Sequence, residues 1–276
     1  MPILPFPEWA PDISSYQAAT SQAISNVVPR ADGYGPFGSL TSFTQALAAG
    51  NDTYTKVLLH FDGVDAATTI TDSNAGGSAH TWTAAGNAQI DTAQSKFGGA
   101  SLLLDGTGDW VSASDHADFA LGSGDFTIEC WFNCNAAGGT FERLAGQCDS
   151  NGQPATNSFF GDRHTSNVMR VQVSNGTSNI GVTGTTQFTD VLNTGWHHYA
   201  VVRTGNVLKL FIDGVQEGGD VAFTGSVPDV SNTFAVGARG EDTANPWTGW
   251  IDEFRLSVGV ARWTSNFTPP GGAYDA

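Results

Sequence analysis

The chain has 276 residues, with 11 lysines and arginines against 27 aspartates and glutamates, and a formal net charge of −16. This acidic balance disfavours a domain with a basic face, so no nucleic-acid partner is expected. Only 14% of the residues are charged, 40% are hydrophobic and 34 are glycine, which is typical of a large β protein rather than a helical or disordered one. No apolar run approaches the roughly 18 residues of a membrane-spanning helix, so no membrane insertion is expected.

Residues 1–50 are predicted to form an extended N-terminal arm. Six of the 11 prolines lie within the first 36 residues, where they fix φ and remove backbone donors. The segment is therefore expected to form no core of its own, and its apolar side chains must pack against a partner. The residues predicted to anchor the arm are Trp9, Tyr16, Val27, Arg30, Tyr34 and Phe37.

Residues 51–276 are predicted to form an all-β sandwich. From Thr55 onward, short apolar runs alternate with a period of two and are separated by turns rich in Gly, Asn, Asp and Ser. The clearest hairpin joins Tyr199–Arg203 to Val207–Ile212. The predicted strands are Val57–Asp62, Ser101–Asp105, Trp110–Ala113, Phe126–Cys134, Arg143–Gly146, Val168–Ser174, Ile180–Thr183, Trp196–Arg203, Val207–Asp213, Thr233–Ala238 and Gly249–Leu256.

Several motifs between about residues 56 and 269 resemble those of one superfamily. They include LDGTGD at 104–109, FIDG at 211–214 and GWIDEFR at 249–255. Their order and spacing are similar to the laminin-G-like, concanavalin A-like lectin/glucanase superfamily. This resemblance implies an antiparallel jelly-roll sandwich of two sheets. It leaves the function open, because this fold carries lectins, glycosidases and purely structural modules.

Two further segments resemble structural proteins of tailed bacteriophages: ISNVVPRADGYGPF at 24–37 and GVARWTSNFTPP at 259–270. This resemblance implies a virion protein of decoration, fibre or spike type, assembled in the bacterial host cytoplasm. The arm would bind other virion subunits, of the capsid or the tail, and the sandwich would adhere to a host-surface glycan. Three cysteines, Cys130, Cys134 and Cys148, cannot all pair within the chain and are expected to be buried thiols, which fits folding in a reducing compartment. Homo-oligomerisation is left open.

No catalytic activity is expected. The Glu-x-Asp-x-Glu pattern of the related glycosidases, which supplies an acid and a nucleophile, does not occur. Asp252 and Glu253 are adjacent and should point to opposite faces of a strand. Serine-hydrolase, zinc-protease and P-loop motifs do not occur either. A glycosidase is therefore the weakest alternative to the virion protein, behind a stand-alone, calcium-dependent carbohydrate-binding module.

Calcium is the expected cofactor, because the predicted loops offer hard oxygen ligands. The loop at 71–78 resembles the Asp-x-Ser-Gly-Asn-Gly loop of laminin-G-like modules, which implies Asp72 and Asn74 as ligands, with Asp252 approaching from the last strand. Asp62 and Asp65 form a second candidate pair. The alternative is that each aspartate caps a turn through its own backbone.

The segment from Arg239 to Trp247 is the candidate glycan-binding loop. Trp247 would stack on a sugar, while Arg239, Asp242 and Asn245 would supply polar contacts. The alternative is that Trp247 packs against the sandwich. Other candidates for stacking are Trp110 and the pair Trp82 with Asn87, and the histidine that shares a face with two apolar neighbours, His198, is expected to be a buried, hydrogen-bonded imidazole.

Overall fold

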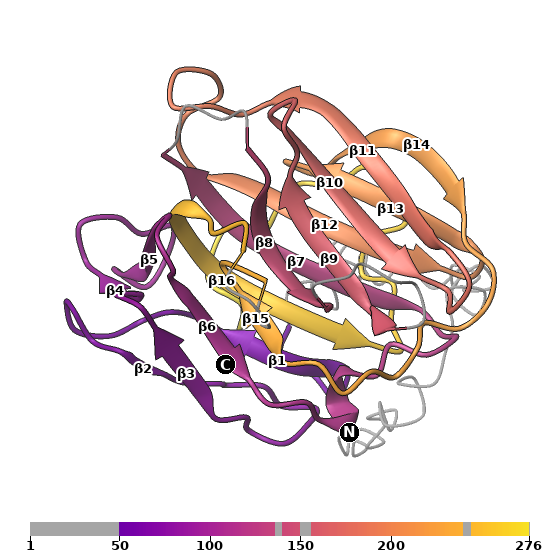
Figure 1. Cartoon of the computed structure of the whole chain (residues 1–276), viewed down its shortest axis with the longest axis horizontal. Coiled ribbons are helices and arrows are strands. Elements are labelled where there is room, and N and C mark those ends of the chain that lie inside the picture. Colours follow the sequence, from indigo (N-terminus) through magenta and orange to yellow (C-terminus); the bar gives the residue numbers. More distant parts are fainter. Residues whose placement is uncertain (1–49, 136–139, 150–155, 240–243, 276) are drawn as a thin grey trace, which may run out of the picture. The chain divides into compact units, whose positions relative to one another are not determined.

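The computed structural model describes residues 50–135, 140–149, 156–239 and 244–275. In these residues the chain forms two antiparallel sheets of eight strands each, packed face to face (Figure 1). The described residues include one complete 3-10 turn, η3 (Ala117–Phe119). None of the described helical structure has the length and apolar character to cross a membrane. The predicted all-β sandwich is therefore confirmed, while the arm and its predicted anchoring residues Trp9, Tyr16, Val27, Arg30, Tyr34 and Phe37 lie outside the described residues.

The first sheet, called the β7 sheet here, is centred on the long strands β7 and β16. β16 pairs with β5 through its first residues and with β1 through its last, so both strands lie on the same side of it. The strand order is β14 (Val215–Ala222), β13 (Val207–Ile212), β12 (His197–Thr204), β7 (Phe126–Cys134), β16 (Thr248–Val258), β5 (Ser101–Asp105) and β4 (Gln89–Asp91), with β1 (Thr55–Leu59) beside β16.

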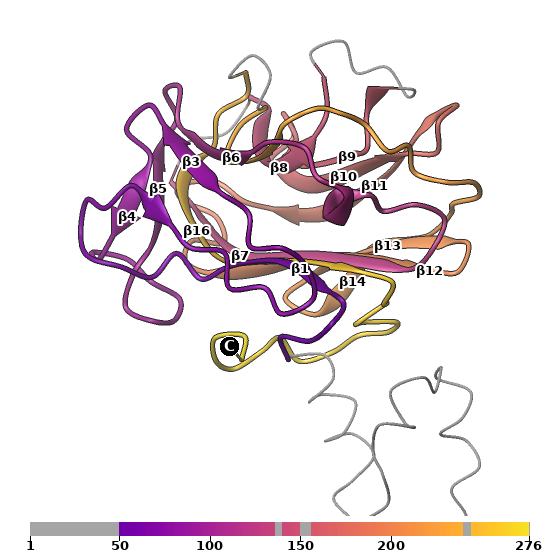
Figure 2. The same ribbon diagram turned by 90° about the horizontal axis from the view of Figure 1, so that it is seen from below.

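The second sheet, called the β9 sheet, covers the first. Figure 2 shows the two sheets as stacked layers, with the C-terminal segment in yellow running along the far side of the β7 sheet. The strand order is β11 (Asn179–Gln187), β10 (Val168–Ser174), β9 (Phe159–Arg163), β8 (Glu142–Gln147), β15 (Phe234–Val236), β6 (Trp110–Ala113), β3 (Trp82–Ala85) and β2 (Thr69–Ile70).

All of the predicted strands have counterparts, but β2, β3, β4, β9 and β14 were not predicted. In β9 the positions that face the other sheet are Phe159, Gly161 and Arg163, so the apolar alternation that marks a half-buried strand is missing. β14 is polar and glycine-rich and mostly exposed. Both strands owe their place to pairing with neighbours that the sequence pattern does reveal.

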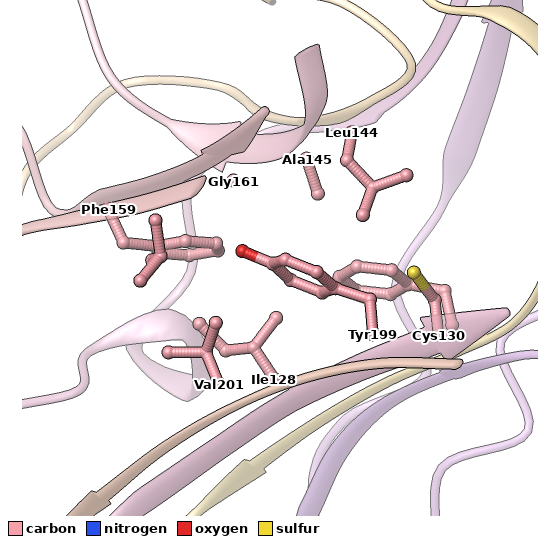
Figure 3. Close-up of a pocket in the computed structure, with 10 residues that line it drawn as sticks. Ile128, Cys130, Leu144, Ala145, Phe159, Gly161, Tyr199 and Val201 are labelled. Carbon is pink, nitrogen blue, oxygen red and sulfur yellow. The ribbon is translucent and has the colours of Figure 1, made fainter. Parts of the chain in front are cut away.

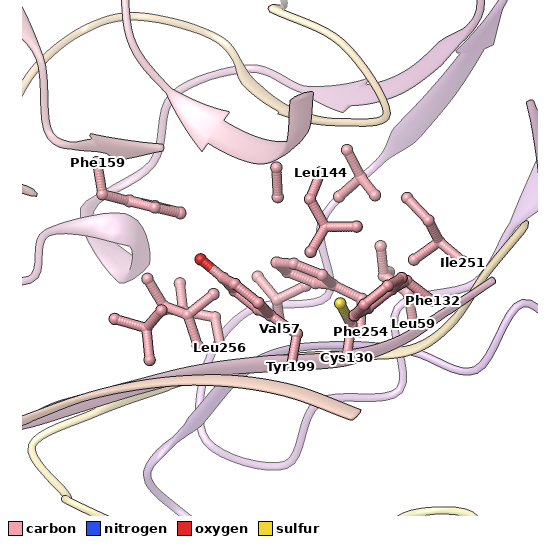
Figure 4. Packing of buried hydrophobic residues seen from close by; sticks show 14 of the residues in the cluster. Val57, Leu59, Cys130, Phe132, Leu144, Phe159, Tyr199, Ile251, Phe254 and Leu256 are labelled. Atoms are coloured by element: carbon pink, nitrogen blue, oxygen red, sulfur yellow. The ribbon is translucent and has the colours of Figure 1, made fainter. Parts of the chain in front are cut away.

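The core lies between the sheets, where alternate residues of each strand point inward (Figure 4). On β7 these are Ile128, Cys130, Phe132 and Cys134. Cys148 is also buried, and all three thiols are free, as predicted. Burial raises the pKa of the Cys130 thiol well above its usual value, so this side chain behaves as an apolar core residue.

Tyr199 on β12 links the two sheets across the core. Its ring crosses toward Gly161 on β9, as Figure 3 shows, and its hydroxyl donates a hydrogen bond to the Arg170 carbonyl oxygen at 3.1 Å. A Cβ atom at position 161 would lie 2.6 Å from the Tyr199 hydroxyl oxygen. Only glycine leaves room for this contact. The Tyr199 hydroxyl thereby fixes the backbone of β10 at Arg170.

Candidate functional site

The outer face of the β7 sheet carries a buried network of charged side chains. Glu129 accepts hydrogen bonds from Arg255 Nε at 2.9 Å, from Arg255 Nη2 at 2.6 Å and from Trp263 Nε1 at 2.8 Å. Burial alone would raise the pKa of Glu129, but Arg255 and His198 outweigh it and hold the pKa well below its usual value. The carboxylate is therefore ionised and fully paired.

The C-terminal segment completes this network. His198 Nε2 lies 3.2 Å from the Tyr274 hydroxyl and 3.4 Å from Glu129 Oε2, and the imidazole is fully buried, as predicted. The Arg255 guanidinium carbon lies 3.8 Å from the centre of the Tyr274 ring. These charges hold the C-terminal segment against the sheet, and the segment in turn covers them.

Asp252 and Glu253 lie on the same face, so the prediction of opposite faces is wrong. The register of β16 against β7 shifts between Asp252 and Arg255, and Glu253 has a φ of 49°. This bulge adds a residue and re-aims the side chain that follows it. Asp252 Oδ2 accepts hydrogen bonds from the backbone amides of Lys96 and Phe97, at 2.7 and 3.1 Å.

Burial raises the pKa of Asp252 to about 7, and the neighbouring charge of Glu253 adds to the rise. Glu253 itself contacts His60 Nδ1 at 2.8 Å and accepts a hydrogen bond from the Tyr274 amide at 2.9 Å. Both carboxyl groups therefore bind segments that pack on this face.

The residues predicted to bind calcium contact separate parts of the chain. Asp72 Oδ1 accepts hydrogen bonds from the Leu58 amide and from Asn74 Nδ2, both at 3.0 Å, and Asp72 Oδ2 accepts from Trp82 Nε1 at 3.3 Å. In the described part of the chain Asp252 shares none of these partners, because its oxygens accept hydrogen bonds from the backbone amides of Lys96, Phe97 and Glu253. Within the described residues, Asp72 and Asn74 therefore form one group and Asp252 another, and the three do not line a common cage.

The second candidate pair is exposed. Asp65 Oδ1 accepts a hydrogen bond from the Thr92 amide at 3.2 Å, which caps a loop. Asp62 lies against the backbone of Gly98, where an added Cβ would fall 1.8 Å from Asp62 Oδ1. Both contacts are to segments distant in the sequence rather than to the turn that carries each aspartate. Calcium binding at any of these aspartates stays a prediction.

Trp247 lies in the core, so its predicted role as an exposed stacking face is wrong. Its exposed fraction is 0%, and its ring packs edge-on against Phe132 with centroids 5.7 Å apart. The large apolar ring gains more by filling the end of the sandwich than by facing water. Of its predicted partners, Arg239 is half-buried, Asn245 is half-buried with a φ of 58°, and Asp242 lies outside the described residues.

The other aromatic residues predicted to stack on a sugar differ in solvent exposure. Trp82 is 5% exposed and its indole donates to Asp72, so it is a core residue. Trp110 is half-buried at the pairing of β6 with β3.

A second group of charged side chains lies on the outer face of the β9 sheet, and we call it the arginine patch. Asp162 Oδ2 accepts hydrogen bonds from Arg143 Nη1 at 3.1 Å and from Arg170 Nη2 at 2.7 Å, and Asp162 Oδ1 accepts from Arg170 Nε at 2.9 Å. The residues that form the patch are Phe141, Arg143, Phe160, Asp162 and Arg170.

Aromatic rings hold both guanidinium groups in place. The Arg143 guanidinium lies 3.8 Å from the centre of the Phe160 ring, and the Arg170 guanidinium lies 5.3 Å from that of Phe141. Phe141 is 38% exposed, whereas Asp162 is 1% exposed. The carboxylate is thus buried beneath the arginines, and an aromatic side chain is left facing solvent.

The arginine patch concentrates positive charge. Two guanidinium groups share the single carboxylate of Asp162, so these three side chains carry a formal charge of +1. Burial lowers the pKa of Arg143, and the charges of Arg170 and Arg239 lower it further, so a third guanidinium lies within electrostatic reach. Arg143 Nε is buried without a hydrogen-bond partner in the part of the chain that the structure describes. The patch is therefore suited to an anionic or hydroxyl-rich ligand.

The arginine patch was not predicted, apart from Arg239, whose charge acts on Arg143. Arg143 and Arg170 lie on predicted strands, and the alternation of β10 indicates an outward side chain at Arg170. That was the available signal. Phe160 and Asp162 lie on β9, which was not predicted, so nothing in the sequence indicated that the two arginines share a partner.

The comparison with protein families agrees with the fold. Residues 105–261, more than half of the chain, match the Laminin_G_3 family, described as the concanavalin A-like lectin/glucanases superfamily. The chain belongs to this superfamily. A search of curated protein sequences finds no match.

Solved structures of concanavalin A-like type share the fold at low sequence identity. The binding domain of Paraclostridial Mosquitocidal Protein 1 has a TM-score of 0.56 and 12% identity, over 76% of this chain and 50% of that one. Domain 4 of AbnA, a GH43 extracellular arabinanase from Geobacillus stearothermophilus solved with arabinotriose, has a TM-score of 0.53 and 17% identity, over 75% and 93%. The binding domain of Botulinum Neurotoxin DC in complex with SialylT has a TM-score of 0.53 and 13% identity, over 75% and 48%. This chain spans about half the length of the two toxin domains.

Proposed function

We propose that this lectin-like sandwich is a non-catalytic carbohydrate-binding module and that its arginine patch binds glycans with acidic sugars. One observation carries the proposal: Arg143 and Arg170 share one buried carboxylate beside a solvent-facing phenylalanine, in a chain whose net charge is −16. A local positive site attracts anionic ligands and has no comparable electrostatic attraction for neutral ones.

The chemistry of the patch matches such a ligand. A guanidinium presents parallel N–H donors that bind a sugar carboxylate or a pair of hydroxyl groups bidentately. The exposed ring of Phe141 offers an apolar surface to the C–H face of a pyranose. Asp162 keeps Arg170 oriented through two hydrogen bonds, so little side-chain entropy is lost on binding.

Two structural neighbours support a carbohydrate as the ligand. The AbnA domain is described in complex with arabinotriose, and the neurotoxin domain in complex with SialylT. Hydrolysis is not supported at the patch, because a glycosidase needs two carboxyl groups that can exchange protons. Asp162 is the carboxyl group of the patch, and arginines occupy both of its oxygens.

The proposal is tested by binding of the full-length protein to panels of acidic and neutral oligosaccharides. We expect acidic members to bind and their affinity to fall with added salt. Arg170→Gln and Phe141→Ala should each lower the affinity by at least about tenfold, the scale of a lost charge-assisted hydrogen bond or a stacking surface. The matched controls are Lys56→Gln and Val215→Ala, which alter a cation and an exposed apolar side chain away from the β9 sheet. Equal binding of neutral and acidic sugars, or equal loss in the controls, would contradict the proposal.

The finer part of the proposal is display on a bacteriophage particle, with residues 1–50 as the anchor to capsid or tail subunits. One geometrical observation supports it. Gly50 pairs with Asp275, and its carbonyl oxygen accepts a hydrogen bond from Arg255 at 3.0 Å, on the outer face of the β7 sheet. The arginine patch lies on the opposite outer face of the sandwich. A domain held at Gly50 would therefore present the patch away from its attachment point.

The virion role has a separate test. Limited proteolysis of the full-length protein, free and on purified particles, should cleave the first 50 residues in the free protein and spare them on particles. Equal cleavage in both states, or failure to co-purify with particles at a fixed copy number, would contradict the anchor while leaving glycan binding standing.

A further inference from the structure

A cluster of two histidines and one aspartate lies at another place in the fold, between the loop that precedes β3 and the turn η3. His80 Nε2 lies 3.5 Å from Asp118 Oδ2, and His116 Nδ1 lies 3.2 Å from the same oxygen. One ligand atom from each of the three residues lies within 4.8 Å of the other two. We call these three residues the histidine cluster.

These separations match the edges of a metal coordination sphere. Zinc binds imidazole nitrogen at about 2.0–2.1 Å and carboxylate oxygen at about 2.0–2.2 Å, so ligand atoms of a tetrahedral site lie about 3.3–3.5 Å apart. The two measured distances to Asp118 Oδ2 fall at this spacing. An ion placed among the three atoms would reach each of them with little movement of the chain.

His80 supplies an independent observation. Its side chain is 5% exposed, and Nε2 is buried without a hydrogen-bond partner in the described residues. A buried polar nitrogen left unpaired costs free energy, and an unexplained one marks a missing partner. The His80 ring cannot easily turn away, because it packs on Phe119 with centroids 4.6 Å apart and on His116 at 4.8 Å. Its unpaired nitrogen is therefore held toward Asp118.

The surrounding backbone orients Asp118. Its Oδ2 accepts a hydrogen bond from the Ser78 amide at 2.8 Å, and a Cβ atom at Gly77 would lie only 2.6 Å from the same oxygen. Glycine at 77 thus allows the loop to approach the carboxylate. Hydrogen bonds of this kind to a ligating carboxylate are typical of the outer shell of metal sites.

His116 is placed by the 3-10 turn itself. Its Nδ1 accepts a hydrogen bond from the Asp118 amide at 3.1 Å and caps η3, while its side chain is 43% exposed. A metal bound at Nδ1 would take the same lone pair, so metal binding exchanges this cap for a coordinate bond. The exposed side of the cluster leaves a fourth position for water or an external ligand.

We propose that the histidine cluster is a binding site for a divalent transition metal, of which Zn²⁺ fits best, with His80, His116 and Asp118 as ligands. Two imidazoles and one carboxylate favour zinc over calcium, which prefers oxygen ligands alone. Bound metal would tie the loop of residues 71–81 to η3. The site is separate from the arginine patch, but it shares the loop of residues 71–81 with the calcium candidates Asp72 and Asn74, since the His80 amide donates a hydrogen bond to Asp72 Oδ2 at 3.3 Å.

The test uses full-length protein stripped with a chelator and titrated with Co²⁺ and Zn²⁺. We expect one saturable site with the visible absorption of tetrahedral Co²⁺, which Zn²⁺ displaces. His116→Ala and Asp118→Asn should each weaken the affinity by at least about tenfold. His164→Ala is the control, because this histidine is half-buried like His80 but lies at the turn between β9 and β10.

Folding of the variants is checked by thermal unfolding without metal. The Asp118→Asn amide oxygen can still accept from the Ser78 amide, so this variant should fold even where a larger truncation does not. In wild type, Zn²⁺ should raise the unfolding midpoint, and in both cluster variants it should not. The absence of saturable Co²⁺ binding, or binding unchanged in His116→Ala and Asp118→Asn, overturns the proposal.

Discussion

On the outer face of the β7 sheet, the guanidinium of Arg255 is fully buried, paired with Glu129 and covered by the C-terminal segment. On the outer face of the β9 sheet, Arg143 and Arg170 share one carboxylate, and the neighbouring phenylalanine faces solvent. Both faces use arginine and aromatic side chains. They differ in exposure: the side chains of Arg255 and Glu129 are 0% exposed, whereas that of Arg170 is 15% exposed and Phe141 is 38% exposed.

The difference separates a structural role from a binding role. Where each charge has its own partner and a segment lies over it, the network holds that segment in place. Where guanidinium groups outnumber the carboxylate that orients them, donor capacity is left for a ligand. We therefore expect substitutions on the β7 face to change stability, and those on the β9 face to change binding.

The largest effect on stability is expected from Glu129→Gln. The change leaves Arg255 buried without its counter-charge, which typically costs about 3–5 kcal/mol in the free energy of unfolding. Denaturant titration followed by tryptophan fluorescence measures it. The control is Asp220→Asn, at an exposed carboxylate that pairs with the largely buried Lys209, and the change in the free energy of unfolding should be about 1 kcal/mol or less. Similar losses in the free energy of unfolding for both variants would contradict a large contribution of the buried Glu129 network to stability.

The next effect concerns pH and Asp252. The unfolded chain releases this proton near pH 3.8, whereas the folded protein keeps it until about pH 7. Between these values the folded state binds more protons, so the carboxyl lowers stability as the pH rises, by up to about 4 kcal/mol. Asp252→Asn removes this dependence.

The raised pKa of His60 acts in the same direction, since its stabilising contact with Glu253 is lost as the pH rises through that pKa. The readout for Asp252 is therefore the difference between Asp252→Asn and wild type. We expect the free energy of unfolding of Asp252→Asn, relative to that of wild type, to increase from about pH 4 to pH 7. Parallel stability curves for the two proteins would rule out the proposed burial of a protonated carboxyl.

Gly161→Ala tests the link between the core and the arginine patch. The added methyl overlaps the Tyr199 hydroxyl, so we expect a loss of about 1–3 kcal/mol and weaker glycan binding through the displaced β10 backbone. Tyr199→Phe removes the overlapping oxygen. The double variant should therefore lose less stability than the sum of the single changes, and strict additivity would argue against the contact.

The smallest effect on stability is expected from Phe141→Ala. This side chain is 38% exposed and lies at the edge of the patch, so its removal should change the free energy of unfolding by less than about 1 kcal/mol. The same variant should lose glycan affinity. A variant that lost stability and kept its affinity would reverse the roles assigned to the two faces.

The sequence predicted the fold well because the long strands of the sandwich alternate strongly, as in the hairpin of β12 and β13. It predicted the burial of His198 for the same reason. The predicted position of Trp247 was wrong, because an aromatic residue in a polar loop has the same local pattern whether its side chain is exposed or buried in the core. The bulge at Glu253 was also hidden, since a positive φ outside glycine leaves no sequence signal.

The histidine cluster and the arginine patch share one reason for being missed. Each joins side chains from separate elements, such as His80 before β3 and His116 at η3, or Arg143 on β8 and Asp162 on β9. Their meeting depends on the pairing of strands, which the local pattern does not encode.

The most direct test of the account is NMR mapping of the full-length protein with an acidic oligosaccharide that binds it. We predict chemical-shift changes at Phe141, Phe160 and the Arg170 side chain on the β9 face, with Trp263 and Tyr274 on the β7 face unaffected. Changes centred on Trp263 and Tyr274, or spread over neither face, would contradict the assignment of binding to the arginine patch.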